Sequence, residues 1–410
     1  MSEKTFAAYI GLDWADAKHD YCLRSATSEK VEYGKMEHTP ALIDQWVMSL
    51  KERFSGQPIA LCLELKSGPI VSCLLKYDFM CLYFVSPQGL ANYRRVFTQS
   101  GAKDDPTDAF LQFDFLTKHF SDLKEIKLDD SETRLLDQLT KHRKSFVGEK
   151  VKLTRKIQAA LKCYYPLILT IFPTIDTAIF CDFIKRWPNL SKLKKARRKT
   201  LEEFFKTHRC GRADVICNRI ELIDTAIALT DDEAVIKPYQ RYALGSVVLL
   251  KKTLETVKEY DVEITKIFKH HKDSHIFASF PGAGNVLAPR LLTAFGTDRS
   301  VFSSASEVTK YSGIAPVLER SGKKVWIHWR FKCSKFLRQT FVEWANQTIK
   351  YSYWAKAFYE EKRAQGKAHQ ATIRALAFKW IRIMYRCWKN HTIYDESKYL
   401  FALKKHGVKS

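Results

Sequence analysis

The chain has 410 residues, of which 46% are hydrophobic and 13% aromatic. A chain of this length is too long for a single hydrophobic core, so two or three folded domains are expected. The apolar content excludes a largely disordered chain. Lysine and arginine number 68 against 45 acidic residues, which gives a formal charge of +23. Such an excess favours nucleic acid as a partner. The alternatives are a basic protein indifferent to nucleic acid and a membrane-surface protein, which would need a basic amphipathic helix with a lipid-facing side.

The N-terminal sequence carries no pattern typical of export. Met1-Ser-Glu-Lys leads directly into a strand pattern, without the charged and then apolar run of a signal peptide, and no apolar segment approaches the length of a membrane span. The ten cysteines lie mostly in apolar strings, which is typical of reduced core residues. We therefore expect a cytoplasmic protein that has no membrane partner.

The first 128 residues alternate between strand patterns and helix patterns. Strands are predicted at 6–13, 21–24, 31–34, 58–64 and 81–85, and helices at 42–50 and 71–77. The runs at 58–64 and 81–85 are continuously apolar, which is typical of central strands that are buried on both faces. The alternation predicts a layered α/β domain.

Residues 129–272 are predicted to be helical, with two separate heptad patterns. The first pattern comprises Leu139, Phe146, Leu153, Ile157, Ala160 and Tyr164, and the second Val247, Leu250, Leu254, Val257, Ile264 and Phe268. An antiparallel hairpin or an oligomer seam would explain both. An ordinary helical bundle explains them equally well, because Arg143, Lys150 and Asp261 interrupt the apolar positions.

A dense basic run at 190–199 separates the two heptad patterns. It contains Lys194, Lys195, Arg197 and Arg198 and no acidic residue. Basic runs usually form a solvated helix face, but the lack of neutralising acids favours a phosphate contact here.

Residues 273–410 contain three further candidate phosphate-binding features. A turn at 281–284, Pro-Gly-Ala-Gly, precedes an apolar helix and can either hold a phosphate or form a tight turn between helices. Cations alternate with aromatic residues at 323–338, a mixture typical of nucleic-acid binding, with Lys323, Lys324, Arg330, Lys332, Lys335 and Arg338 as candidates. A later helix aligns Lys379, Arg382 and Arg386 beside an apolar stripe.

Four carboxylates stand where a metal site is expected. Asp13 and Glu64 end predicted strands, and Asp105 and Asp108 lie three residues apart at a predicted helix start. Taken singly, each is explained as a helix cap or a surface charge. Carboxylates at buried strand ends are costly unless paired or metal-bound, and hard oxygen ligands suit Mg²⁺. Together they predict a magnesium site.

These motifs occur in one order along the chain. Gly11-Leu-Asp13, the Glu64 strand and Lys103-x-Asp105-x-x-Asp108-Ala precede the Pro-Gly-Ala-Gly turn, which is followed by Tyr311-Ser-Gly-Ile-Ala-Pro and Arg320-Ser321-Gly-Lys. Essentially the whole chain resembles the DEDD transposases of the bacterial insertion sequence 110 family. RNA-guided members of that family are called bridge recombinases.

The resemblance implies a fold class and a division into three domains. An α/β RNase H-like (RuvC-like) domain with the DEDD metal site is expected at 1–128, a helical coiled-coil region at 129–272, and a mostly α-helical transposase domain at 273–410. The resemblance also implies donor and target DNA duplexes, a structured noncoding guide RNA (the bridge RNA), and dimers that join into a tetrameric synapse in the bacterial cytoplasm.

The resemblance assigns the catalytic roles as well. Ser321 corresponds to the serine that attacks DNA and forms a phosphoserine intermediate, while Asp13, Glu64, Asp105 and Asp108 hold Mg²⁺. Around Ser321, Gly322 would permit close approach of a phosphate, and Arg320, Lys323 and Lys324 would stabilise negative charge; Lys103 belongs to the carboxylate motif.

Several alternatives stay open at this point. An ordinary Ser-Gly turn explains residues 321–322, and Ser312 is a local competitor as nucleophile. Asp104 stands where the family has threonine and could replace Asp105, and Lys332-Cys-Ser departs from the family's lysine-arginine-glycine turn. The runner-up function is a metal-dependent endonuclease of the Holliday-junction type, without a serine intermediate. The third is a catalytically silent nucleic-acid-binding protein.

Overall fold

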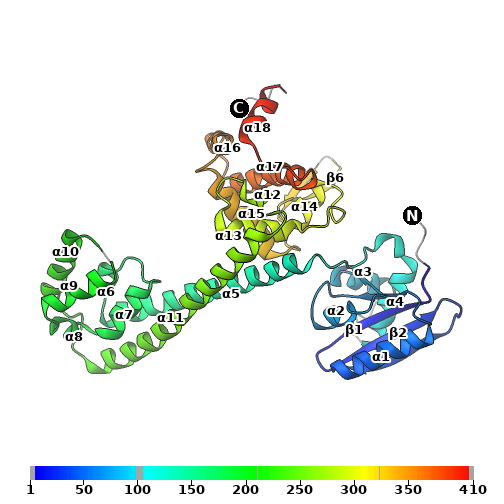
Figure 1. Cartoon of the computed structure of the whole chain (residues 1–410), viewed down its shortest axis with the longest axis horizontal. Coiled ribbons are helices and arrows are strands. Elements are labelled where there is room, and N and C mark those ends of the chain that lie inside the picture. The colour runs from blue at the N-terminus through cyan, green and yellow to red at the C-terminus, as the bar shows by residue number, and fades with distance from the viewer. Residues whose placement is uncertain (1–4, 98–104, 210, 323, 406–410) are drawn as a thin grey trace. The chain divides into compact units, whose positions relative to one another are not determined.

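The computed structural model describes residues 5–97, 105–209, 211–322 and 324–405. The chain forms two compact units, Met1–Leu128 and Asp129–Ser410, which we call the first and second unit (Figure 1). The further division of the second unit at residue 272 stays a prediction. Among the described residues, no helix is long and apolar enough to cross a membrane.

The first unit is built on a mixed five-stranded sheet in the order β3-β2-β1-β4-β5. Its strands are β1 (Ala8–Trp14), β2 (Lys18–Ser25), β3 (Val31–Glu37), β4 (Ile59–Leu63) and β5 (Met80–Phe84). The first three form an antiparallel meander, whereas β4 runs parallel to β1, and β5 parallel to β4. The predicted α/β fold of the N-terminal domain is confirmed at this level.

Helices cover both faces of this sheet. They are α1 (Pro40–Arg53), α2 (Pro69–Leu74), α3 (Pro87–Phe97) and α4 (Asp105–Lys118). Because strand side chains alternate in direction, Ile10 and Leu61 pack in one core with α1 and α2, while Ala60 and Cys62 pack in another with α3 and α4. The continuous apolar runs of β4 and β5 follow from this burial on both faces.

Gly11 sets how closely α4 approaches β1. A Cβ atom at Gly11 would lie 2.0 Å from the carbonyl oxygen of Ala109 and 2.4 Å from the amide nitrogen of Phe113. Both atoms belong to the α4 backbone and cannot rotate away. Only glycine therefore allows α4 to lie this close to β1, the strand that carries Asp13.

The second unit is mostly helical, and its two longest helices lie side by side. Helices α5 (Ser131–Tyr164) and α11 (Glu233–His270) run antiparallel (Figure 1). Nε of Arg143 donates to Oδ1 of Asp261 at 2.5 Å, so two of the polar residues that interrupt the heptads pair with each other. The predicted antiparallel hairpin is present, while a coiled-coil or oligomeric role for it stays a prediction.

Five short helices connect α5 to α11. They are α6 (Leu167–Ile171), α7 (Ala178–Arg186), α8 (Leu190–Lys194), α9 (Arg198–Thr207) and α10 (Ala213–Asp224). Their apolar residues, including Phe172, Phe183 and Phe205, form a core with the adjoining ends of α5 and α11. This insertion thus has its own hydrophobic centre.

The C-terminal part of the second unit surrounds a core rich in tryptophan. It comprises α12 (Ser274–Ala278), α13 (Gly284–Phe295), α14 (Ala305–Tyr311), β6 (Val317–Ser321), β7 (Lys324–His328), α15 (Lys335–Thr348), α16 (Tyr353–Ala364), α17 (His369–Lys389) and α18 (Glu396–Lys405). Trp344, Trp380 and Trp388 are fully buried. The Pro-Gly-Ala-Gly turn joins α12 to α13, and Nε1 of Trp344 donates to the carbonyl of Pro281 at 3.0 Å. A tight turn between packed helices accounts for these glycines.

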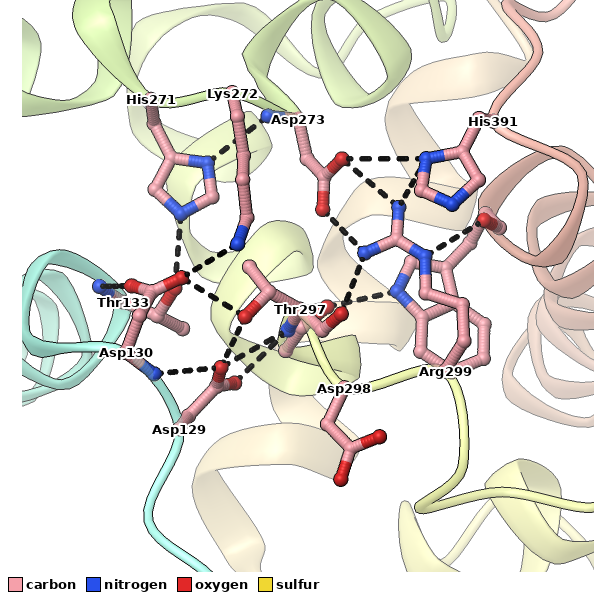
Figure 2. Close-up of polar contacts among 12 residues, drawn as sticks. Asp129, Asp130, Thr133, His271, Lys272, Asp273, Thr297, Asp298, Arg299 and His391 are labelled. Carbon is pink, nitrogen blue, oxygen red and sulfur yellow. Dashed lines mark hydrogen bonds and ion pairs between the residues drawn. The ribbon is translucent and has the colours of Figure 1, made fainter.

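A polar network fastens the start of α5 to this C-terminal core. Figure 2 shows it between the α5 N-terminus, the end of α11, the loop after α13 and the end of α17. The Thr297 amide donates to Asp129 Oδ2 at 2.9 Å, and the guanidinium of Arg299 pairs with the buried carboxylate of Asp273 at 2.5 Å. The first residue of the second unit is therefore held by side-chain bonds.

Candidate active site and nucleic-acid interface

The sheet of the first unit brings Asp13 and Glu64 together. Strands β1 and β4 are parallel neighbours in which Gly11 is opposite Cys62. The pairing ends there, two residues before Asp13 in β1, and Glu64 directly follows the last residue of β4. Because Gly11 faces α4, the period of two in β1 turns Asp13 toward that same face.

Asp108 comes to this face from the first turns of α4. Its side chain is buried, and it forms an ion pair with Arg94 of α3. The close approach of α4 at Gly11 holds this part of the helix against β1. Lys103, Asp104 and the side chain of Asp105 lie outside the described residues, so a choice between the two aspartates stays open.

Asp20 is an acidic residue at this edge that sequence reasoning missed. It is the cross-strand partner of Asp13, is buried, and lies 3.7 Å from Nζ of Lys35. Residues directly opposite in an antiparallel pair point to the same face. A register drawn for the first hairpin would have found it, because the Asp13–Asp20 pairing follows from the short loop between the strands.

The described carboxylates are of the right chemistry for a hard cation but are not gathered into a metal-binding group. Within the described residues, no three His, Cys, Asp or Glu side chains converge closely enough to hold an ion. Arg94 supplies the positive charge that a buried carboxylate requires. Carboxylate oxygens are nevertheless the ligands that Mg²⁺ prefers, and Asp13, Glu64 and Asp108 belong to the part of the first unit where β1, the end of β4 and α4 meet.

Ser321 lies at the tip of the β6–β7 hairpin in the second unit. It pairs with Lys324 across the last register position, and Gly322, with a φ of 57°, makes the left-handed turn that favours glycine. Ser321, Arg320 and Lys324 are all exposed, and Lys323 lies outside the described residues. The structure thus presents a hydroxyl group to solvent beside Lys324, while Arg320, the preceding residue of β6, belongs to the opposite face of the hairpin.

The two other polar candidates near this serine are placed differently. Ser312 is completely buried after α14, and its Oγ donates to the carbonyl of Thr309 at 3.3 Å. His328 pairs with Val317 at the far end of the hairpin and contacts Glu319 at 3.1 Å. Four residues of strand separate it from Lys324, about 14 Å. Neither side chain is in place to react or to serve as a base beside Ser321.

Comparison with known proteins agrees with this arrangement of two motifs on two units. A transposase model of the IS110 DEDD type matches residues 10–166, and a model of the IS116/IS110/IS902 transposase family matches residues 274–360. The chain belongs to the IS110 family of transposases. By family it is therefore a DNA transposase.

Relatives of this transposase extend over almost its whole length. The "Mini-circle putative transposase for IS117" of Streptomyces coelicolor is 25% identical over 409 residues, covering 97% of this chain and 98% of the relative. An IS900 protein of Mycobacterium paratuberculosis is 21% identical and covers 94% and 96%. An IS110 protein of Streptomyces coelicolor is 24% identical and covers 72% of each chain.

The remaining predicted nucleic-acid-binding residues of the transposase fall into three places. Around the α8–α9 junction, Lys194, Lys195, Arg197 and Arg198 are exposed, whereas Leu193, which precedes them, is buried. Arg198 pairs with Glu202 at 3.2 Å. On α17, Arg382 and Arg386 are exposed, whereas the ammonium group of Lys379 lies 4.2 Å from the ring centre of Phe358. Lys379 is thus partly committed to packing.

The third place is the segment that follows β7. Lys332 and Lys335 are exposed, but Nε of Arg330 donates to the carbonyl of Ala315 at 3.1 Å and so fastens the base of the hairpin. Ser334 caps α15 by accepting from the Leu337 amide at 3.3 Å. The departure from the family's lysine-arginine-glycine turn therefore produces a normal helix start.

Proposed function

We propose that this transposase exchanges DNA strands by transesterification, with Ser321 as the nucleophile. The observation that carries the proposal is the exposed serine between Arg320 and Lys324 at a glycine turn. Oγ of Ser321 would attack a backbone phosphorus, lose its proton and form a phosphoserine ester, while the bond to the leaving DNA oxygen breaks and that oxygen takes up a proton. A hydroxyl end of the partner duplex would then displace the serine. One ester replaces another at each step, so no external energy source is required.

The cationic neighbours of Ser321 would support this chemistry. Lys324 is the cross-strand partner of Ser321 and Arg320 directly precedes the serine in β6, so once the tip is ordered by a bound strand both charges would be near the phosphate that reaches the serine. Cations held near a phosphoryl group stabilise the negative charge that develops during transfer. Ser312 has no comparable access because it is buried.

We further propose that the first unit is an RNase H-like (RuvC-like) domain that holds Mg²⁺. Asp13 in β1, Glu64 directly after β4 and Asp108 on the helix that packs against these strands would supply oxygen ligands, and Asp105 would complete the set. A Mg²⁺ ion there would polarise phosphate oxygens. Binding would require Asp108 to exchange its contact with Arg94 for the ion.

The family resemblance supports two further parts of the proposal. A structured guide RNA would pair with donor and target DNA, so that base pairing rather than side chains selects the sites. Dimers would join into a tetramer that holds both duplexes. The formal charge of +23 suits a chain that contacts RNA and DNA together. Sequencing the RNA that co-purifies with the protein tests the first part.

The decisive experiment is to look for a covalent protein–DNA adduct. The chain, purified with its bound RNA, is incubated with Mg²⁺ and phosphate-labelled DNA carrying the ends of the insertion element, and label on the denatured protein is measured. Ser321→Ala is expected to abolish the labelled protein. Ser312→Ala is the control and is expected to retain it, because that hydroxyl is buried.

The endonuclease alternative predicts a different outcome in the same assay. It requires Ser321→Ala to cut DNA at the wild-type rate, with hydrolysed ends and no label on the protein. Asp13→Asn tests the third alternative. A catalytically silent binding protein does not cleave DNA, so this substitution would leave every measured activity unchanged. Survival of the adduct in Ser321→Ala would refute the serine assignment.

A further inference from the structure

Two arginines from distant parts of the second unit meet on one tryptophan. Trp329 follows β7, and the guanidinium carbon of Arg374 on α17 lies 4.0 Å from the centre of its indole ring. The guanidinium carbon of Arg338 on α15 lies 4.9 Å from the same ring. All three side chains are partly buried. Cation–π contacts of this kind fix a guanidinium in orientation as well as in place.

This pair of arginines lacks the acidic partner that several other arginines of low exposure have. Within the described residues, neither Arg338 nor Arg374 forms an ion pair with a carboxylate. Four other arginines of low exposure each do, in the pairs Arg94–Asp108, Arg143–Asp261, Arg290–Glu343 and Arg299–Asp273. Burial and the nearby charge of Arg338 lower the pKa of Arg374. Two positive charges are therefore held together at a cost that a bound anion would remove.

We propose that Arg338 and Arg374 together bind one phosphodiester group of the DNA backbone, with Trp329 as the platform that holds them in place. The proposal rests on the proposed function and deepens it by naming a DNA contact. Guanidinium groups donate in a planar fork that matches phosphate oxygens. One N–H of Arg338 is used on the carbonyl of Arg330 at 3.1 Å, which steadies the side chain and leaves other donors for a ligand.

We call Trp329, Arg338 and Arg374 together the cradle. Its place in the fold favours DNA as the ligand. Trp329 continues directly from β7, whose other end pairs with Ser321. Five residues of strand separate Lys324 from Trp329, about 17 Å, which is the axial rise of about five base pairs. The cradle is thus too far away to hold the reacting phosphate. It would hold the same duplex a few nucleotides away and so set the direction in which the strand reaches the serine.

Salt-dependent binding tests the cradle. Affinity of the full-length chain for a DNA duplex of about 30 base pairs is measured by fluorescence anisotropy at several salt concentrations, with an RNA duplex of the same sequence as a second arm. Arg374→Gln and Arg338→Gln are each expected to weaken DNA binding about tenfold. Each is expected to lower the slope of log affinity against log salt, and the double variant is expected to lower it by about 0.9, because the two arginines neutralise one phosphate.

The matched control removes the same charge elsewhere in the second unit. Arg363 on α16 is exposed and far in sequence from the hairpin, so Arg363→Gln is expected to leave affinity and slope unchanged. Thermal unfolding shows which variants fold. Two arginine variants are used so that the test can still be made if one of them fails to fold. Arg374→Lys keeps the charge without the fork and is expected to retain the slope while losing part of the affinity.

Three results would overturn the inference. One is wild-type affinity and slope in both glutamine variants, and another is an equal loss in Arg363→Gln. The third is weakened binding of the RNA duplex alone, which would assign the cradle to RNA. The proposed function fails separately, because it is decided by the Ser321→Ala adduct and not by salt dependence.

Discussion

Replacing Gly11 with alanine should displace the helix that carries the acidic motif. The added Cβ would lie 2.0 Å from the Ala109 carbonyl oxygen, whereas ordinary contacts begin near 3.4 Å, so α4 has to retreat by about 1.4 Å. Overpacking of this kind typically costs 1–3 kcal/mol, and we expect about 3 kcal/mol because the clashing atoms are backbone. For a unit of this size the melting temperature of the first unit should fall by roughly 10 °C.

The same displacement moves Asp108 away from Asp13 and Glu64. A misplacement of about 1 Å in a catalytic site can cost about a hundredfold in rate, so adduct formation should fall by about that factor. Calorimetry of the full chain measures the first effect, and the adduct assay measures the second. Affinity for DNA should be nearly unchanged, because the proposed cradle lies in the other unit.

Gly148→Ala is the matched control for this substitution. Gly148 lies inside α5, and a Cβ there meets nothing within 4 Å. Because glycine destabilises a helix interior relative to alanine, this variant should gain about 0.5–1 kcal/mol. If Gly11→Ala melts and reacts like the wild type, the steric account of how α4 is positioned is wrong.

Three further predictions concern buried charge. Arg94→Gln removes the ion pair between Arg94 and the buried carboxylate of Asp108, so the first unit should lose about 3–5 kcal/mol without metal and regain much of it with Mg²⁺. Absence of a Mg²⁺-dependent rise in melting temperature would contradict the proposed site. Asp273→Asn should destabilise the second unit by a similar amount, measured by calorimetry, because Arg299 then loses its anionic partner; an unchanged melting temperature would count against that role. Burial and the neighbouring His38 lower the pKa of His19 from 6.5 to about 4, so the unfolded state binds more protons between these values. Stability of the first unit should therefore fall as pH drops from about 6.5 to about 4, and His19→Asn should flatten that part of the profile.

The elements with a strong periodic signal were predictable from the sequence. The apolar runs of β4 and β5 and the heptads of α5 and α11 depend on local burial, which the sequence displays directly. The β6–β7 hairpin was not predicted, because almost all of its residues are exposed and no apolar alternation marks it. Strand structure there comes from pairing alone.

The acidic motif was predictable for a similar reason, and its surroundings were not. Asp13 and Glu64 each follow a recognisable buried strand, and parallel strands bring such ends together. Arg94 and Arg374 carry no such signal. The role of each arginine depends on a contact with another element. Arg94 contacts Asp108 and Arg374 contacts Trp329, and only the folded structure shows these contacts.

The exposure of the hairpin that carries Ser321 has a consequence for selectivity. Both of its faces meet solvent, and a two-stranded hairpin without a packed face is only marginally stable in water. Arg330 fastens its base, but the tip gains no stability from the core of its own unit. Contacts made by the substrate then have to order the tip before Ser321 can react. DNA that binds without ordering it would be held but not cut, so cleavage can be more selective than binding.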